Sequence, residues 1–297
     1  MYRGAAAPSR AELDAHVGAG LIETMRAREG CIAHRAWHLA RLAASIRTVG
    51  PDDAPDADAI ARSLDLTLAA IPPGDARVRL VVGAREACAV EIAPIEPLPE
   101  GPRACTAMTV TGGWVPVDAD AEHKRTDRRH WGRVERQAAA AGADIALMTD
   151  QAGHLGESSR ASVFVAADGI LRTAPVEGLL PGIGRRAIMQ LAGVAVEEAA
   201  DPATWRRADE IFVVSALGGV SAVTVIDGAP VGGGTVGPRT RDLAAQYRAA
   251  VDAGTASDGV AWLPRQASPG LRVTDGGRTG MTATLPSSSW MTRSDTP

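Results

Sequence analysis

Hydrophobic residues in the first hundred positions follow two periods, one typical of strands and one typical of helices. Trp37, Leu39, Leu42 and Ile46 recur at the spacing of a helix face, and Gly50 ends the pattern. A second helix is predicted over residues 57–71, before a Pro-Pro-Gly stop. Apolar runs predict strands at residues 21–28, 76–84, 87–95 and 105–111. The first part of the chain should therefore pack helices on an antiparallel sheet.

The second half combines strands and helices in another order. The pattern predicts a helix through Arg136 and Ala141, then strands at residues 143–150, 154–167 and 170–175. Helices are predicted at 182–193, 201–208 and 239–254, with a strand–loop–strand over 210–227. We place the link between two domains near Gly112-Gly113. This gives an N-terminal domain of residues 1–112 and a C-terminal domain of residues 113–254.

Residues 255–297 lack periodicity and are rich in Ser, Thr, Gly and Pro, which predicts a flexible tail. Trp262 and Trp290 are unusual in such a tail and could dock on the body of the protein. Truncation near Gly254 is expected to cost little stability.

Composition narrows the class of protein. Of the 297 residues, 45% are hydrophobic and 22% are charged, and the net charge of −4 argues against a nucleic-acid partner. No apolar run approaches the roughly 20 residues of a membrane span, and the first residues lack a signal-peptide pattern. The three cysteines, Cys31, Cys88 and Cys105, have no metal-like spacing. We therefore expect a cytoplasmic protein with reduced thiols, no metal site and no membrane partner.

Lys124 lies in a polar turn, HKRTDRR, beside several arginines and Asp127. Such a run is most often a solvated basic turn. A lysine that forms a Schiff base must instead be partly desolvated or lie near other cations, so that its pKa falls and the free amine is available. The neighbouring arginines are compatible with this second interpretation.

Glu157 lies in LGESSRASVF, between two apolar segments. The simpler interpretation is an exposed strand residue or an ion-pair partner for Arg160. The alternative is a carboxylate beside the pyridine nitrogen of pyridoxal phosphate (PLP). In that position it keeps the nitrogen protonated, so that the ring can accept electrons from the substrate.

Three further segments could bind a phosphate. Pro181-Gly182 opens a helical pattern, and backbone amides at a helix N-terminus bind anions. The segment Ser215–Gly219 follows a strand and could supply amide or hydroxyl donors, although alone it is simply a loop. Arg41 is most simply a surface arginine but would suit a phosphate clamp. Together with Lys124 and Glu157, these residues suit a site that binds PLP and reacts it with an amine.

In their order and spacing, these segments resemble the class IV family of PLP enzymes. That family includes branched-chain aminotransferases, D-amino-acid aminotransferases and aminodeoxychorismate lyases. The resemblance covers residues 17–245, through LIETMR, HLARL, HKRTDR, ALMTDQAGHLGESSRASVF, LRTAP, GLLPGIGR and ADEIFVVSALGGVSAV. It implies an α+β (α/β two-domain) protein of fold type IV. A small N-terminal α/β domain, a larger C-terminal domain with a barrel-like sheet, and a homodimer are expected.

The resemblance also implies roles for individual residues. Lys124 is implied as the catalytic lysine that holds PLP as a Schiff base, and Glu157 as the partner of the pyridine nitrogen. Further cofactor contacts are implied for Arg41, Ile183, Gly184, Ser215 and Ala216. Two departures stand out: Ser162 replaces a common Asn, and the Tyr often found after the lysine is absent, with Trp131 the nearest aromatic residue.

The sequence leaves the reaction open. The Lys-x-x-Asp-Arg turn ending at Arg128, and Ser215-Ala-Leu in place of Gly-Thr, favour an aminodeoxychorismate lyase that releases pyruvate and 4-aminobenzoate. Thr24 fits a catalytic hydroxyl position in such a site. A transaminase of branched-chain or D-amino acids is the alternative, with Arg128 or Arg160 binding the substrate carboxylate. A degenerate protein that binds the cofactor without turnover would have little reason to retain both Lys124 and Glu157.

Overall fold

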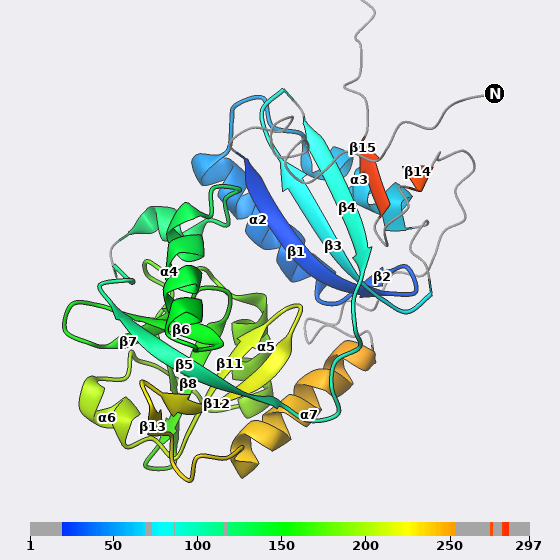
Figure 1. The fold of residues 1–297 in the computed structure, drawn as a ribbon. Coiled ribbons are helices and arrows are strands. Elements are labelled where there is room, and N and C mark those ends of the chain that lie inside the picture. Colours follow the sequence, from blue (N-terminus) through cyan, green and yellow to red (C-terminus); the bar gives the residue numbers. More distant parts are fainter. Residues whose placement is uncertain are drawn as a thin grey trace, which may run out of the picture.

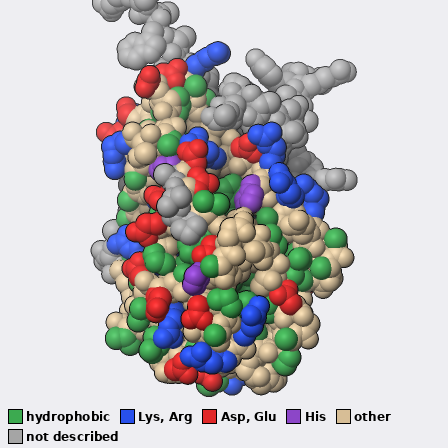
Figure 2. Space-filling view, turned by 90° about the vertical axis from the view of Figure 1, so that its left-hand side faces the viewer, with side chains coloured by type: hydrophobic (Ala, Val, Ile, Leu, Met, Phe, Trp, Pro, Cys, Tyr) green, Lys and Arg blue, Asp and Glu red, His purple; other side chains and the backbone are tan. Residues whose placement is uncertain are grey.

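The computed structural model describes residues 20–68, 73–85, 87–115 and 118–253, together with the backbone of 274–275 and 281–284. The chain forms two sheets, one of six strands and one of nine, with helices packed against each (Figure 1). No helix in these ranges is long and apolar enough to cross a bilayer. On the face drawn in Figure 2, acidic and basic side chains are interspersed and do not form one large field of a single sign.

The first sheet is antiparallel and carries helices on one face, as the sequence pattern predicts. Its main strands are β1 (Leu21–Arg28), β2 (Cys31–Ile32), β3 (Asp75–Val82) and β4 (Cys88–Pro94), and its helices are α2 (Arg35–Val49) and α3 (Ala57–Leu68). Side chains alternate between the two faces of each strand. Met25 of β1 and Leu80 of β3 thus pack against Leu42 and Leu64 of the two helices.

The second sheet closes into a six-stranded barrel. Its members are β5 (Arg103–Thr111), β6 (Ile145–Thr149), β7 (Leu155–Ser158), β8 (Ser162–Ala167), β11 (Glu210–Ser215) and β12 (Gly219–Ile226). The pairing of Glu157 in β7 with Ser162 in β8 completes the ring. Three short strands extend the sheet outside the barrel: β9 (Ile170–Thr173), β10 (Val196–Glu197) and β13 (Ala229–Pro230).

Alternation along the barrel strands also explains how the helices attach. Val163 and Val213 face the interior cluster of the barrel, whereas Phe164 and Phe212 point outward and stack with ring centroids 5.0 Å apart. The outer cluster packs against two of the helices, α5 (Ile183–Ala192) and α7 (Pro238–Asp252). The other helical elements are η1 (Ala119–Glu122), α4 (Arg129–Ala140) and α6 (Pro202–Arg206).

Two details differ from the sequence-based expectation. The single strand expected over residues 154–167 is a hairpin, because the chain turns at Ser159–Ala161 and the Ser158 amide donates to the Ala161 carbonyl at 2.8 Å. Strand β5 pairs with β6 and β12 of the barrel. The chain therefore passes from the first sheet to the second between β4 and β5, ahead of the expected link at Gly112-Gly113.

The expected tail lies mostly outside the described residues, including Trp262 and Trp290. Two short strands within it, β14 (Thr274–Asp275) and β15 (Met281–Thr284), extend the first sheet, with β15 antiparallel to β4. The flexibility of the tail stays a prediction.

Candidate active site

Lys124 lies where the two sheets meet. The Ile22 amide of β1 donates to the Lys124 carbonyl at 2.8 Å, and the Thr126 amide donates to the Gly20 carbonyl at 2.9 Å. Leu21 and Arg125 form an isolated antiparallel bridge. The segment that carries Lys124 is therefore fixed to the first strand of the N-terminal sheet by its backbone.

Burial lowers the pKa of Lys124 from its ordinary value to about 8. Glu23 opposes this shift, whereas Arg41, Arg128 and Arg79 add to it as nearby positive charges. The side chain is half-buried. A fraction of the amine is therefore uncharged near neutral pH, as a nucleophilic lysine requires.

The reactivity of Lys124 should follow this lowered pKa. In pulse labelling with acetic anhydride, the rate of Lys124 acetylation should rise with pH and level off above about 8, because only the uncharged amine reacts. An ordinary lysine would keep gaining reactivity up to about pH 10.4. Mass spectrometry of the peptide containing Lys124 gives the rate, and the N-terminal amine of the same sample is the internal reference. An inflection above pH 10 would contradict the assignment.

Glu157 lies at the seam that closes the barrel, on β7. Its side chain is buried, and burial raises its pKa to about 7. Hydrogen bonds from the Trp131 indole and the Leu180 amide, and the charge of Arg128, oppose the shift but do not cancel it. Glu157 is thus a buried carboxyl that can hold or release a proton near neutral pH.

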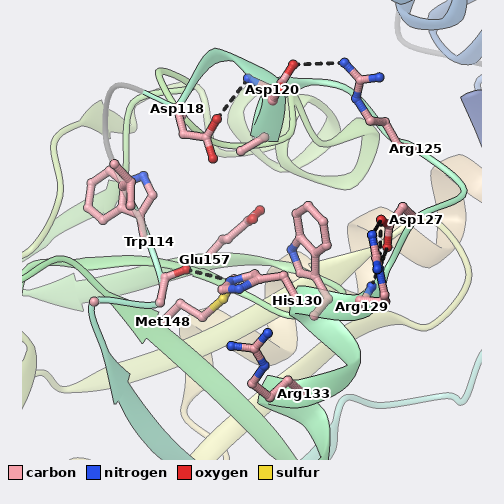
Figure 3. A pocket seen from close by; sticks show the side chains of 16 residues that line it. Trp114, Asp118, Asp120, Arg125, Asp127, Arg129, His130, Arg133, Met148 and Glu157 are labelled. Carbon is pink, nitrogen blue, oxygen red and sulfur yellow. Dashed lines mark hydrogen bonds and ion pairs between the residues drawn. The ribbon is translucent and has the colours of Figure 1, made fainter.

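The Glu157 carboxyl points into a cavity of about 520 Å³ (Figure 3). Trp114 and Met148 lie on its apolar side, and Asp118 and Asp120 lie along its rim. The Trp114 ring can lie against β7 because residue 156 is glycine, since a Cβ there would come within 2.6 Å of the ring. Lys124 is not among the residues that line this cavity, although its neighbours Ala121 and Arg125 are.

The charge of Arg128 acts on both Lys124 and Glu157. Its charge lowers the pKa of both groups, so it favours a neutral amine and an ionised carboxylate. The guanidinium donates to the Ser159 carbonyl at 2.8 Å and lies 4.5 Å from the centre of the Trp131 ring. The structure thus places Arg128 beside the residues that flank Glu157.

Arg41 extends from α2 toward the N-terminus of α5. It donates to both carboxylate oxygens of Glu23, at 2.7 and 2.8 Å, and to the Pro181 carbonyl at 2.9 Å. His38 contacts the same carboxylate at 2.7 Å. Burial alone would raise the pKa of Glu23, but Arg41 and His38 hold it well below its usual range. These contacts use three of the five guanidinium hydrogens, which leaves two for an anion.

The N-terminus of α5 lies close to the C-terminal end of β11. A Cβ at Gly184 would lie 2.8 Å from Val214 and 3.4 Å from the carbonyl carbon of Ser215. A Cβ at Gly182 would collide with the Ser162 hydroxyl. Glycine at both positions therefore allows the backbone amides of α5, Ser162 and Ser215 to approach one another, and Arg41 reaches the same turn through Pro181.

These donors fit PLP. Helix N-terminal amides, an arginine and a serine are suited to its phosphate. A neutral lysine amine is suited to its aldehyde, and a buried carboxyl is suited to its ring nitrogen. The positions of Lys124, Glu157, Arg41, Ile183, Gly184, Ser215 and Ala216 are compatible with the roles that the resemblance implies, and these roles remain proposals.

Two further residues were predicted to lie at the site. Thr24 is half-buried on the face of β1 opposite to Glu23, across from Arg79 of β3. Arg160 is exposed at the β7–β8 turn and pairs with Glu135 of α4 at 3.2 Å. Neither residue lines the cavity at Glu157.

Sequence reasoning did not identify two residues that the structure places at the site. Glu23 holds Arg41, and an acid inside the apolar run LIETM could have indicated a buried partner. Trp131 lies beside Glu157 in the cavity and lowers the pKa of its carboxyl. One further signal was available in the composition: of the 31 lysine and arginine residues, Lys124 is the one lysine.

Comparison with known proteins gives one consistent family. The model of the family "Amino-transferase class IV" matches residues 20–226. A candidate branched-chain-amino-acid aminotransferase of Methanocaldococcus jannaschii is 28% identical over 253 residues, which cover 78% of this chain and 86% of that protein. The chain spans 38%, 19% and 21% of the length of a Pseudomonas aeruginosa branched-chain-amino-acid aminotransferase and two Arabidopsis thaliana relatives.

Solved structures have the same fold. The PLP-bound form of a hypothetical aminotransferase from Mycobacterium tuberculosis has a TM-score of 0.70 at 23% identity, covering 84% of this chain and 95% of that one. A candidate 4-amino-4-deoxychorismate lyase from Legionella pneumophila has a TM-score of 0.65 at 21% identity, covering 77% and 90%. The predicted family, its fold type and its cofactor class are confirmed at the level of the family. Because the family model covers more than half of the chain, this chain belongs to the class IV aminotransferases, a family of PLP-dependent enzymes.

Proposed function

We propose that the chain is a PLP-dependent enzyme that transfers the amino group of an amino acid to a 2-oxo acid, with Lys124 as the lysine that binds the cofactor. The observation that carries the proposal is that Lys124 is the one lysine of the sequence. A chain that uses arginine for all its other long cationic side chains retains lysine where the amine is half-buried and has a pKa of about 8. Arginine cannot be deprotonated in a protein, so chemistry that needs a free amine requires lysine there.

Some residues of the site would bind the cofactor, and others would hold or transfer protons. Arg41, the amides at the start of α5 and the Ser215 hydroxyl would hold the phosphate. Glu157 would hold a proton at the ring nitrogen. PLP, when bound, supplies an aldehyde that condenses with amines and a ring that accepts electrons from the substrate α-carbon. The Lys124 Nζ, as an uncharged amine, would take the α-proton of the substrate and return a proton to complete the transfer.

Amino transfer is favoured over elimination by the relative that covers most of this chain, a candidate branched-chain-amino-acid aminotransferase. An aminodeoxychorismate lyase remains the second candidate. It is supported by Arg128 beside Glu157 and by Ser215-Ala216-Leu217 at the end of β11.

A pair of half-reactions separates the two candidates. Purified protein loaded with PLP is mixed with single L- and D-amino acids, and conversion of the cofactor to its amine form is followed by absorbance. In parallel, aminodeoxychorismate is supplied and pyruvate is assayed. We expect rapid conversion with at least one branched-chain or D-amino acid, and no pyruvate. Pyruvate release without conversion by any amino acid would replace the transaminase with the lyase.

A further inference from the structure

A buried arginine of the N-terminal sheet contacts the loop that follows β11. Arg26 of β1 is 4% exposed and donates to the Leu217 carbonyl through Nε at 3.1 Å and through Nη2 at 2.6 Å. Its Nη1 contacts Asp75, itself buried, and the Glu96 carbonyl at 3.1 Å. The guanidinium is therefore held by its own sheet while it binds a single carbonyl of the other.

The Leu217 carbonyl belongs to the same peptide plane as the Gly218 amide. Because the described peptide bonds are all trans, the C=O and N–H of this plane point in opposite directions. With the carbonyl directed at Arg26, the Gly218 amide is directed at the Ser215 hydroxyl, to which it donates at 3.0 Å. A hydroxyl oxygen that accepts this bond keeps its own hydrogen for another acceptor.

We propose that Arg26 is a positioning residue for the phosphate end of the site, which acts by fixing the Leu217–Gly218 peptide plane and thereby aiming the Ser215 hydroxyl. The proposal rests on the proposed function, because the acceptor of that hydroxyl is taken to be the PLP phosphate. Ser215 is also held from the other side, since the hydroxyl of buried Tyr247 lies 3.4 Å from its carbonyl oxygen. Arg26 thus holds the Leu217–Gly218 peptide from the first sheet, so the position of this peptide depends on how the two sheets meet.

The chain offers a matched control. Arg28, two residues along β1, also pairs with Asp75, but its other partner is Asp252 of α7 at 2.7 Å. Replacing either arginine with lysine keeps a cation beside Asp75. Only Arg26→Lys removes the guanidinium whose Nε and Nη2 both donate to the Leu217 carbonyl. A role limited to pairing with Asp75 would therefore affect both variants alike.

Two measurements on the full chain test the proposal. The dissociation constant for PLP is measured by absorbance titration for the unaltered chain, Arg26→Lys, Arg28→Lys, Ser215→Ala and the double variant Arg26→Lys/Ser215→Ala. Hydrogen exchange of the Gly218 amide is measured without PLP. We expect Arg26→Lys to weaken PLP binding about tenfold, as loss of a charge-assisted hydrogen bond implies, and Arg28→Lys to stay within about twofold. In the Ser215→Ala background, Arg26→Lys should weaken PLP binding by less than about threefold further, because the two substitutions affect the same contact with the phosphate.

Equal losses in Arg26→Lys and Arg28→Lys, or the full tenfold loss persisting in the Ser215→Ala background, would overturn the proposal. So would unchanged exchange of the Gly218 amide in Arg26→Lys. If Arg26→Lys does not fold, Arg26→Gln is compared with Arg28→Gln, because both remove a charge beside Asp75 and only the first removes the two-nitrogen contact with the Leu217 carbonyl. Failure of the unaltered chain to bind PLP would refute the proposed function, while the exchange measurement would still decide whether Arg26 fixes the loop.

Discussion

Replacing Lys124 with arginine is expected to abolish turnover and the absorbance of covalently bound PLP. Arginine preserves the positive charge beside Glu23, but its guanidinium stays protonated and cannot condense with an aldehyde. Lys124→Ala should give the same loss, because it also lacks the amine. Activity should fall to the background of the free cofactor in both variants, by orders of magnitude.

The comparison of the two variants separates chemistry from structure. Phosphate binding by Arg41, the start of α5 and Ser215 does not require the amine, so PLP should still bind non-covalently to Lys124→Ala. Absorbance spectra with and without PLP, circular dichroism and the turnover assay are measured on the same preparations. Turnover near that of the unaltered chain in Lys124→Ala, with the fold intact, would show that the amine is not required.

Glu157→Gln is expected to lower turnover by about a hundredfold or more while raising the melting temperature of the PLP-free protein. Glutamine retains the shape and can still accept a hydrogen bond through its one carbonyl oxygen, but it cannot hold a proton at the ring nitrogen. The buried carboxylate destabilises the folded protein wherever it is ionised. Removing it should therefore gain a few degrees of melting temperature above pH 7, although the site works less well.

The pH dependence gives the sign of this effect. The pKa of Glu157 is about 7 in the folded protein and lies near 4.5 when the chain unfolds, so between these values the folded state binds more protons. The unaltered chain thus loses stability as pH rises from about 4.5 to about 7, and the gain from Glu157→Gln should shrink toward pH 5. Calorimetry at several pH values tests this, with Glu135→Gln on α4 as the control. A pH-independent difference, or turnover within a few-fold of the unaltered chain, would refute the role of Glu157.

The sequence pattern was sufficient for the segments whose periodicity is set by one buried face. Residues 21–28 and 35–49 lie against one core, so apolar spacing predicts both the strand and the helix. The hairpin at Ser159–Ala161 was not predicted, because the turn contains neither Gly nor Pro to interrupt the strand pattern. The placement of β5 could not be predicted either, since its partners β6 and β12 lie far along the chain and local periodicity does not encode pairing.

In the candidate site, too, some residues could be predicted from the sequence and others could not. Lys124 and Glu157 were identified because the order of segments resembles a family, and burial then accounts for their shifted pKa values. The roles of Glu23 and Arg26 depend on contacts between elements distant in sequence, with Arg41 in one case and the Leu217 carbonyl in the other. A local pattern can indicate that such a charged residue is buried, but not which distant residue it contacts. The homodimer expected from the resemblance also stays a prediction, because it depends on a second chain.

The central claim, that Lys124 carries the cofactor, is tested most directly by trapping the bond. The full chain is incubated with PLP, reduced with borohydride, digested and mapped by mass spectrometry. Because Lys124 is the one lysine of the chain, the N-terminal amine is the only other primary amine that could be labelled. We predict a phosphopyridoxyl group on Lys124 at close to one per chain. An unmodified Lys124 under conditions in which PLP is bound, or label at the N-terminus alone, would contradict the account.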